Sequence, residues 1–274
     1  MKGNGFVEGE NVTIVYRWAG GKIDRMPELA SELVRRQVAV LVTAGDAGAL
    51  AAKAATTVIP IVFHSGTDPV KVGLVASLAR PGGNMTGVNF FAAEIAPKRL
   101  EYLRALVPEA VRVAALLNPA NPNMDAVSRD LETAARAMGL RIQAYHASTV
   151  DEIDASFSAF ARDGADALFV AGDPVFRSRR VQLSLLAAHY RLPATYALRD
   201  YAEAGGLMSY GASLSDAWRQ GGVYVSRILK GAKAADLPVV QSSKFELVLN
   251  LQPARMLRLT VPSALLSTAD EVIE

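Results

Sequence analysis

The chain has 274 residues, of which 51% are hydrophobic and 20% charged, and its formal net charge at pH 7 is +2. So small a net charge, with no block of like charges, gives no reason to expect a nucleic-acid partner. The absence of cysteine excludes disulfides, thiolate nucleophiles and cysteine-ligated metal sites, and no apolar run approaches the roughly 20 residues of a membrane-spanning helix.

Short β-rich runs alternate with amphipathic stretches from the start of the chain. Strands are predicted over residues 11–18, 38–45, 59–66 and 85–90, with helices over 24–37, 47–56 and 68–79 between them. Strands that alternate with helices of ten residues or more indicate βαβ units and a parallel sheet.

The alternation restarts after a long predicted helix over 93–108. Strands are predicted over 111–119, 140–147, 165–172, 192–197 and 206–211, and helices over 123–138, 151–163, 175–191 and 198–204. The fold class is therefore α/β, with two doubly wound lobes. In such lobes ligands bind outside the carboxyl ends of the parallel strands.

The segments that follow the predicted strands are rich in Ser, Thr, Asn, Asp and Gly, and most of them open a helix. They are residues 43–48 and 64–69 in the first lobe, and 118–123, 171–175, 196–200 and 209–211 in the second. A helix N-terminus offers unpaired N–H groups to a carboxylate or phosphate. These segments predict a pocket for an anionic or polar ligand.

Each polar feature also has a purely structural interpretation. Asp68 and Asp173 both precede proline, as an N-cap does, and for either one alone capping is the favoured interpretation. Tyr196 and Tyr210 end strands, where they either pack or flank a flat ligand.

Enzyme chemistry finds little support in the sequence. Of the three histidines, only His64 follows a strand, and an enzyme would have to pair it with Asp68 or Asp173. No HExxH, GxSxG, P-loop or GxGxxG motif occurs. Polar strand ends without an acid/base or nucleophile set are typical of binding without turnover.

Six stretches carry a family resemblance. The most specific is "SGTDPVKVGLVASLARPGGNMTGV" at 65–88, and agreement continues at 8–19, 50–63, 106–123, 201–211 and 245–274. In them the chain resembles the substrate-binding proteins of ABC transporters, in the subgroup that includes tryptophan- and other amino-acid-binding members.

The resemblance implies a type I periplasmic-binding-protein fold with a hinge of three crossovers, near 89–94, 210–215 and 239–248. The N-terminal lobe would take residues 1–92 and 213–240, and the C-terminal lobe 93–212 and 241–274. The implied function is closure around a small polar or aromatic solute, such as an amino acid, and delivery to a membrane permease. No enzymatic activity, cofactor, metal or nucleic acid is implied, and the implied location is periplasmic.

The resemblance also implies a ligand site. In amino-acid-binding relatives, amides and hydroxyls of the first lobe take the carboxylate, and an acidic residue of the second lobe, matched by Asp173, takes the amine. Ala47 stands where relatives often have Ser or Thr, so one hydroxyl is missing. The implied ligand-binding residues are Gly45, Asp46, Ala47, Ser65, Gly66, Asn118, Asp173, Tyr196 and Tyr210.

Relatives begin with a signal peptide, a strand, a ligand-contacting loop and a helix before the segment that matches residues 5–12. Without that strand, which lies inside the sheet, residues 38–45 present an unpaired edge. We therefore expect either direct pairing of 11–18 with 38–45, or a homodimer in which a second chain supplies strands. The alternative function is the effector-binding core of a LacI-type regulator without its DNA-binding domain.

Overall fold

The computed structural model describes residues 2–90, 95–121 and 124–274. The chain divides into two compact units. Unit 1 comprises Met1–Phe91 and Leu214–Ser243, and unit 2 comprises Ala92–Ser213 and Lys244–Glu274, so the chain passes between them three times. The expected lobe boundaries were 92/93, 212/213 and 240/241, and most of the first expected crossover, 89–94, lies outside the described residues.

Unit 1 is built on a parallel sheet in the order β1-β2-β3-β9. Its strands are β1 (Leu41–Ala44), β2 (Ile61–Ser65), β3 (Met85–Asn89) and β9 (Val240–Gln241). Its helices are α1 (Met26–Arg35), α2 (Gly45–Ala55) and α9 (Leu214–Leu229), with 3-10 turns η1 (Lys2–Asn4), η2 (Ile23–Arg25) and η3 (Ala234–Asp236).

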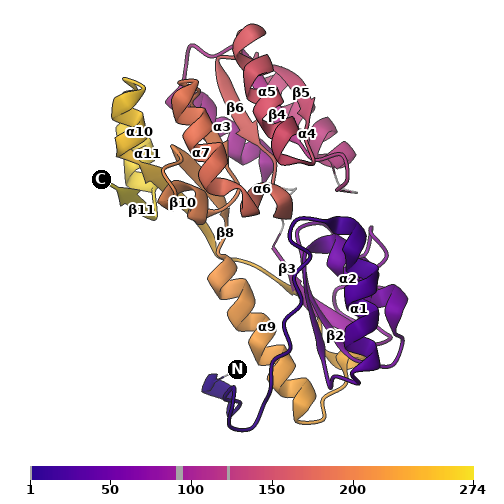
Figure 1. Ribbon diagram of the computed structural model, residues 1–274. Helices are drawn as coiled ribbons and strands as arrows, with labels where there is room; N and C mark the ends of the chain where they lie inside the picture. The colour runs from indigo at the N-terminus through magenta and orange to yellow at the C-terminus, as the bar shows by residue number, and fades with distance from the viewer. Residues whose placement is uncertain (1, 91–94, 122–123) are drawn as a thin grey trace. The chain divides into compact units, whose positions relative to one another are not determined.

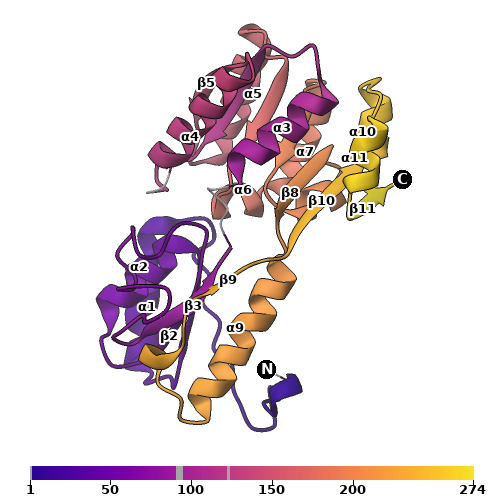
Figure 2. The same ribbon diagram turned by 180° about the vertical axis from the view of Figure 1, so that it is seen from behind.

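Helices cover both faces of this sheet, as Figures 1 and 2 show. Ile61 and Phe63 pack with Ala49 and Ala52 of α2, whereas Val62 packs with α9. Because neighbouring strand residues point to opposite faces, a strand covered on both sides must be apolar nearly throughout. All five residues of β2 are buried, which explains the continuous apolar run in the sequence.

Unit 2 contains a larger sheet in the order β11-β10-β8-β7-β6-β4-β5, parallel except that β10 runs antiparallel to β8. Its strands are β4 (Arg112–Leu117), β5 (Arg141–His146), β6 (Ala167–Val170), β7 (Ala194–Tyr196), β8 (Met208–Ala212), β10 (Phe245–Asn250) and β11 (Glu271–Ile273). Its helices are α3 (Ala96–Leu106), α4 (Met124–Ala137), α5 (Val150–Arg162), α6 (Pro174–Ser178), α7 (Arg180–His189), α8 (Arg199–Glu203), α10 (Leu251–Met256) and α11 (Ser263–Thr268).

The core of unit 2 has two layers, one on each face of the sheet. Val113 of β4 and Phe169 of β6 pack with α3 and α4, and the intervening residues, such as Leu116, pack with α5 and α7. This alternation confirms the α/β class with strands buried on both faces. The single antiparallel pair makes the sheet mixed, which the sequence did not indicate.

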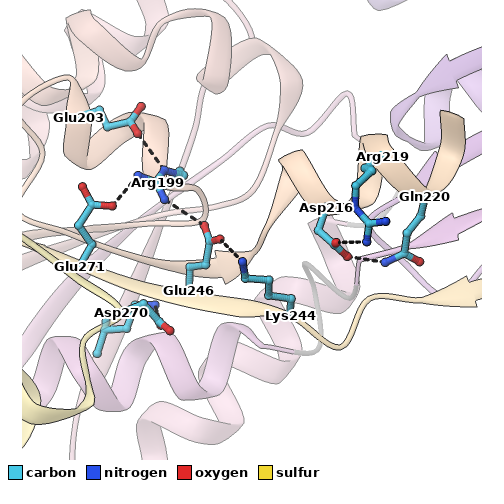
Figure 3. A network of polar contacts seen from close by, with 10 residues as sticks. Arg199, Glu203, Asp216, Arg219, Gln220, Lys244, Glu246, Asp270 and Glu271 are labelled. Atoms are coloured by element: carbon cyan, nitrogen blue, oxygen red, sulfur yellow. Dashed lines mark hydrogen bonds and ion pairs between the residues drawn. The ribbon is translucent and has the colours of Figure 1, made fainter. Parts of the chain in front are cut away.

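An ion-pair network holds the last strands of unit 2 to α8 (Figure 3). Arg199 donates to Glu203 at 2.8 Å, to Glu271 at 2.6 Å and to Glu246 at 3.5 Å. The hydrogen bonds to Glu203 and Glu271 hold the pKa of Arg199 above its ordinary value. One guanidinium therefore links α8 to both β10 and β11, the two strands at the antiparallel end of the sheet.

Two predicted elements of unit 1 are wrong. The strand predicted over 11–18 is absent, and within the described chain β1 pairs only with β2, so the first expected alternative, direct pairing of 11–18 with 38–45, is also wrong. The alternating side chains Ile14, Tyr16 and Trp18 are exposed rather than packed on a sheet. The helix predicted over 68–79 is a series of turns, because Gly73 adopts a left-handed φ of 73° after one turn.

The extended segment 13–19 is held to α1 by a charged pair. Arg17 Nε donates to Glu32 Oε2 at 2.6 Å, and Arg17 Nη2 donates to Glu32 Oε1, a bidentate geometry. The bonds from Arg17 lower the pKa of Glu32 from 4.5 to about 2. Because the folded pKa lies below the ordinary one, this stabilisation is present above about pH 4.5 and is lost as the pH falls through about 2.

Replacing Glu32 with Gln should release Arg17. Trypsin must seat that guanidinium in its own acidic pocket, so we expect several-fold faster cleavage of the Arg17–Trp18 bond. Timed digestion with mass spectrometry measures the rate, and Glu28→Gln, at an exposed position of the same helix, is the matched control. Equal cleavage in the two variants would show that the pair does not hold the segment.

Candidate functional site

In unit 1 the carboxyl ends of β1 and β2 meet at one edge of the sheet, with Ala44 in register with His64. α2 begins directly after β1, and Gly45 makes the change of direction with a φ of 76° that only glycine adopts readily. No side chain caps this 11-residue helix. The N-cap residue is Ala44, whose side chain has no hydrogen-bonding atom, and a helix N-terminus is a general place for an anion to bind.

The second strand end of unit 1 lies against this helix. The buried Ser65 hydroxyl is within hydrogen-bond distance of Asp46 Oδ1, and it lies 2.8 Å from the carbonyl oxygen of Thr67. Gly66, which follows, is also buried. The structure thus brings together the two turns that the sequence analysis selected, residues 45–47 and 65–66.

His64 faces away from these turns, toward α9. Its Nδ1 lies 3.2 Å from the carbonyl oxygen of Thr43 and its Nε2 lies 3.2 Å from that of Ala217, and the ring packs 4.0 Å from Trp218. Burial lowers the pKa of His64 below 6.5, although both carbonyl groups oppose this shift. Both ring nitrogens thus face backbone carbonyl oxygens, and the neutral imidazole can donate to only one of them.

The acids considered as partners of His64 have other roles. Asp68 accepts a hydrogen bond from the amide of Val70 at 2.9 Å, and its carboxylate lies 3.9 Å from the Lys71 ammonium. Asp173 caps a helix of unit 2. The enzyme interpretation therefore has no acid/base pair around His64 in the described residues.

In unit 2 the candidate site centres on Asp173, which follows β6 and is the N-cap of α6. Oδ1 accepts from the amides of Val175 at 2.8 Å and Phe176 at 3.3 Å, and from Asn118 Nδ2 at 3.0 Å. Oδ2 accepts from Asn121 Nδ2 at 3.0 Å. The structure confirms the capping interpretation. Among the described residues Oδ1 thus receives three donors and Oδ2 receives one, so Oδ2 is the oxygen with room for a further donor.

Asn118 organises this corner. It is fully buried, and its Oδ1 accepts from the amide of Ala120 at 3.0 Å and from the Ser148 hydroxyl at 2.8 Å. Its amide nitrogen holds Asp173, so the ends of β4 and β6 and the residues after β5 are connected through one side chain. Pro122 and Asn123, the last residues of the predicted segment 118–123, lie outside the described residues.

The two tyrosines differ. Tyr196 is 0% exposed and stacks on Tyr201 with 4.7 Å between ring centroids, inside the core of unit 2. Its ring gives a ligand at the strand ends no free face, so we do not retain it in the proposed site. Tyr210 is half-buried, packs edge-on against Tyr102 at 5.0 Å, and keeps part of its surface in solvent.

Sequence reasoning missed Arg99. This side chain is 1% exposed, donates from Nη2 to the carbonyl oxygen of Val170 at 2.9 Å, and lies 3.9 Å from the ring centroid of Phe169. Burial lowers its pKa from 12.5 to about 9, so it stays charged at neutral pH. Nε and Nη1 have no partner among the described residues. The only sequence signal was its place on the apolar face of a helix, beside Leu100 and Leu103.

With the geometry established, the comparisons with known proteins identify the family. The model of the family described as ABC transporter substrate binding protein matches residues 1–273. The chain belongs to this family. Substrate-binding proteins of ABC transporters bind a small-molecule solute and work with a permease; they are not enzymes, and they are generally extracytoplasmic.

Individual relatives agree with the family assignment. A tyrosine-binding protein of Clostridioides difficile (strain R20291) is 25% identical over 250 residues, which cover 91% of this chain and 72% of the relative. A crystal structure of a conserved domain protein from Vibrio cholerae O1 biovar eltor str. N16961 has a TM-score of 0.91 at 27% identity, covering 99% of this chain and 90% of that one. The ABC domain from Streptococcus pneumonia in complex with L-Trp has a TM-score of 0.86 at 26% identity, covering 96% and 90%.

The family assignment also decides between the two functions considered from the sequence, an ABC transporter substrate-binding protein and the effector-binding core of a LacI-type regulator. A LacI family transcriptional regulator from Bifidobacterium animalis subsp. lactis DSM 10140 is only 11% identical, with a TM-score of 0.58 over 82% of this chain. That likeness shows the fold alone. The fold of these substrate-binding relatives is the type I periplasmic-binding-protein fold, as expected from the sequence.

No helix among the described residues is long and apolar enough to cross a membrane. Within the same ranges no three His, Cys, Asp or Glu side chains gather as a metal-binding group.

Replacing Asp173 with Ala should destabilise unit 2, because α6 loses its cap and two asparagine amides lose their acceptor. We expect a loss of about 1–3 kcal/mol in the free energy of unfolding. Urea unfolding measures it, together with faster hydrogen exchange at the amides of Val175 and Phe176. Asp151→Ala, at an exposed first-turn position of α5, is the control and should change stability by less than about 0.5 kcal/mol. Unchanged exchange at both amides would contradict the capping role.

Proposed function

We propose that the solute of this substrate-binding protein is an amino acid with an aromatic side chain. Two relatives support this class, one named as a tyrosine-binding protein and one crystallised with L-Trp. The observation in this chain that carries the proposal is the uncapped first turn of α2 at the carboxyl edge of the unit 1 sheet. A free amino acid has a carboxylate that such amides bind well.

In this proposal the solute's charged ends are held by different units. The amides of Gly45, Asp46 and Ala47 take the carboxylate, with the Ser65–Gly66 turn beside them. Oδ2 of Asp173 takes the ammonium group. Asn118 holds Asp173 in place, and the exposed part of Tyr210 contacts the aromatic ring.

Binding of one solute by both units favours a closed arrangement, because the ligand gains contacts only when the units come together. The closed form would then dock on the permease. We place this activity in the periplasm, which agrees with the generally extracytoplasmic location of the family.

Ligand analogues combined with one substitution test the site. L-Tryptophan should bind at least about 100-fold more tightly than tryptamine, which lacks the carboxylate. Asp173→Asn keeps a cap oxygen but loses the charge, so it should weaken tryptophan binding by about 10- to 100-fold. Indole-3-propionate, which lacks the amine, should bind both proteins equally.

Calorimetry on the four protein–ligand combinations isolates the amine–Asp173 interaction from any general loss of stability. An equal loss of affinity for tryptophan and for indole-3-propionate would contradict the role of Asp173. Failure of all aromatic amino acids to bind would contradict the solute class.

A second copy of the chain on the outer edge of β1 stays a prediction. In the described residues this edge has no strand partner, and Val42 is 44% exposed. The amide of Leu41 bonds to the carbonyl of Pro60, so by alternation the amide of Val42 points outward. Val42→Pro removes that outward donor without breaking the pairing to β2. Light scattering should show a dimer for the unchanged protein and for Val42→Thr, and a monomer for Val42→Pro; a monomer in all three would refute the pairing.

A further inference from the structure

A cavity inside unit 2 is distinct from the proposed solute site. It has a volume of about 190 Å³ and is bordered by residues of α7, α10 and the beginnings of β7 and β8. Leu192 and Ala194 border it at the start of β7, and Leu207 immediately precedes β8. These positions belong to the amino ends of parallel strands, whereas Asp173 follows a carboxyl end. Opposite ends of the strands lie at opposite edges of one sheet.

The walls of the cavity are mostly apolar. Ala187, Ala188, Pro253, Met256 and Leu257 line it from the two helices, and Met256 is 71% exposed at the rim. Apolar cavities of about 150 Å³ stay dry and bind a molecule as large as benzene. This cavity therefore has room for a body of about six to eight non-hydrogen atoms.

Tyr196 borders the cavity as a core residue. It is 0% exposed and stacks on Tyr201 with 4.7 Å between ring centroids. Burial raises the pKa of Tyr196, and a hydrogen bond with Ser184, which also borders the cavity, opposes that rise. Its hydroxyl therefore belongs to the core rather than to the ligand.

A cation lies at the same cavity. Arg191 follows α7 with a φ of 53°, is exposed, and lines the cavity. The structure gives its guanidinium no ion pair with the described residues, and no acidic side chain is among the residues that line the cavity. An anionic group at the rim would therefore meet a positive charge without a competing carboxylate.

We propose that this cavity is a second ligand site, for a small carboxylic acid with an apolar body. The body fills the space between α7 and α10, and the carboxylate pairs with Arg191. This site is independent of the solute proposed above.

Hexanoate, 1-hexanol and hexylamine test the charge preference, since they share one body. In NMR titrations of the whole chain, hexanoate should bind saturably, with a dissociation constant on the order of millimolar as expected for eight heavy atoms. Hexanoate should bind at least about tenfold more tightly than hexanol, because its carboxylate gains a charge-assisted bond to Arg191. Hexylamine should not bind, because its ammonium group is repelled by Arg191. Each titration is repeated with saturating L-tryptophan; an unchanged result separates this site from the proposed solute site, whether or not tryptophan binds.

Two variants locate the binding. Arg191→Gln should bring hexanoate down to the affinity of hexanol, whereas Arg141→Gln, at an exposed arginine of β5, should change nothing. Ala188→Leu fills the cavity from a partly exposed position and should abolish binding of both compounds without lowering the melting temperature.

The proposal is overturned if hexanoate and hexanol bind equally to the unchanged protein, or if no saturable binding occurs. It is also overturned if Arg191→Gln and Ala188→Leu both bind hexanoate as the unchanged protein does.

Discussion

Parallel pairing of the strands is the constraint on which the rest of the structure depends. It sends the carboxyl ends of β1, β2 and β3 to one edge of unit 1, and those of β4, β6 and β7 to one edge of unit 2. Helices cover both faces of each sheet, so polar side chains that follow the strands are buried or half-buried at these edges. Most buried polar groups need a partner, and neighbouring strand ends supply one for Ser65, Asn118 and Asp173.

The two edges meet this requirement in different ways. In unit 1 the Ser65 hydroxyl lies on Asp46, while the first amides of α2 receive no side-chain cap. In unit 2 the Asp173 carboxylate receives four hydrogen bonds from the described residues, two of them from asparagine side chains. One edge therefore offers donors and the other offers a fixed negative charge. An amino acid carries the complementary pair of charges, which is why we propose an amino acid as the solute.

The fold could be predicted from the sequence where burial determines the pattern. The apolar runs that became β2, β4 and β6 are covered on both faces, and no other element type suits short runs of this kind. Residues 11–18 alternate apolar and polar side chains, but no strand lies beside them among the described residues. An alternating pattern without a neighbouring strand does not form a sheet. The turns over 68–79 depend on the left-handed backbone conformation of Gly73. A glycine permits that conformation but does not require it, so the sequence alone could not predict the end of the helix.

The candidate site was predictable only in part, for similar reasons. Strand-end position identified Ser65, Asn118 and Asp173, but a position along the chain does not show where a ring points. Tyr196 therefore turned out to be a core residue that lines a separate cavity, and Arg99 turned out to be a buried charge on an apolar helix face.

The central claim is that α2 receives the carboxylate of the solute. Backbone ¹H–¹⁵N spectra, recorded during titration with L-tryptophan and with tryptamine, test it most directly. The account predicts saturable downfield shifts of the amide protons of residues 45–47 with tryptophan, and none at these residues with tryptamine. Tryptophan binding that leaves these amides unshifted, or shifts them as tryptamine does, would contradict it.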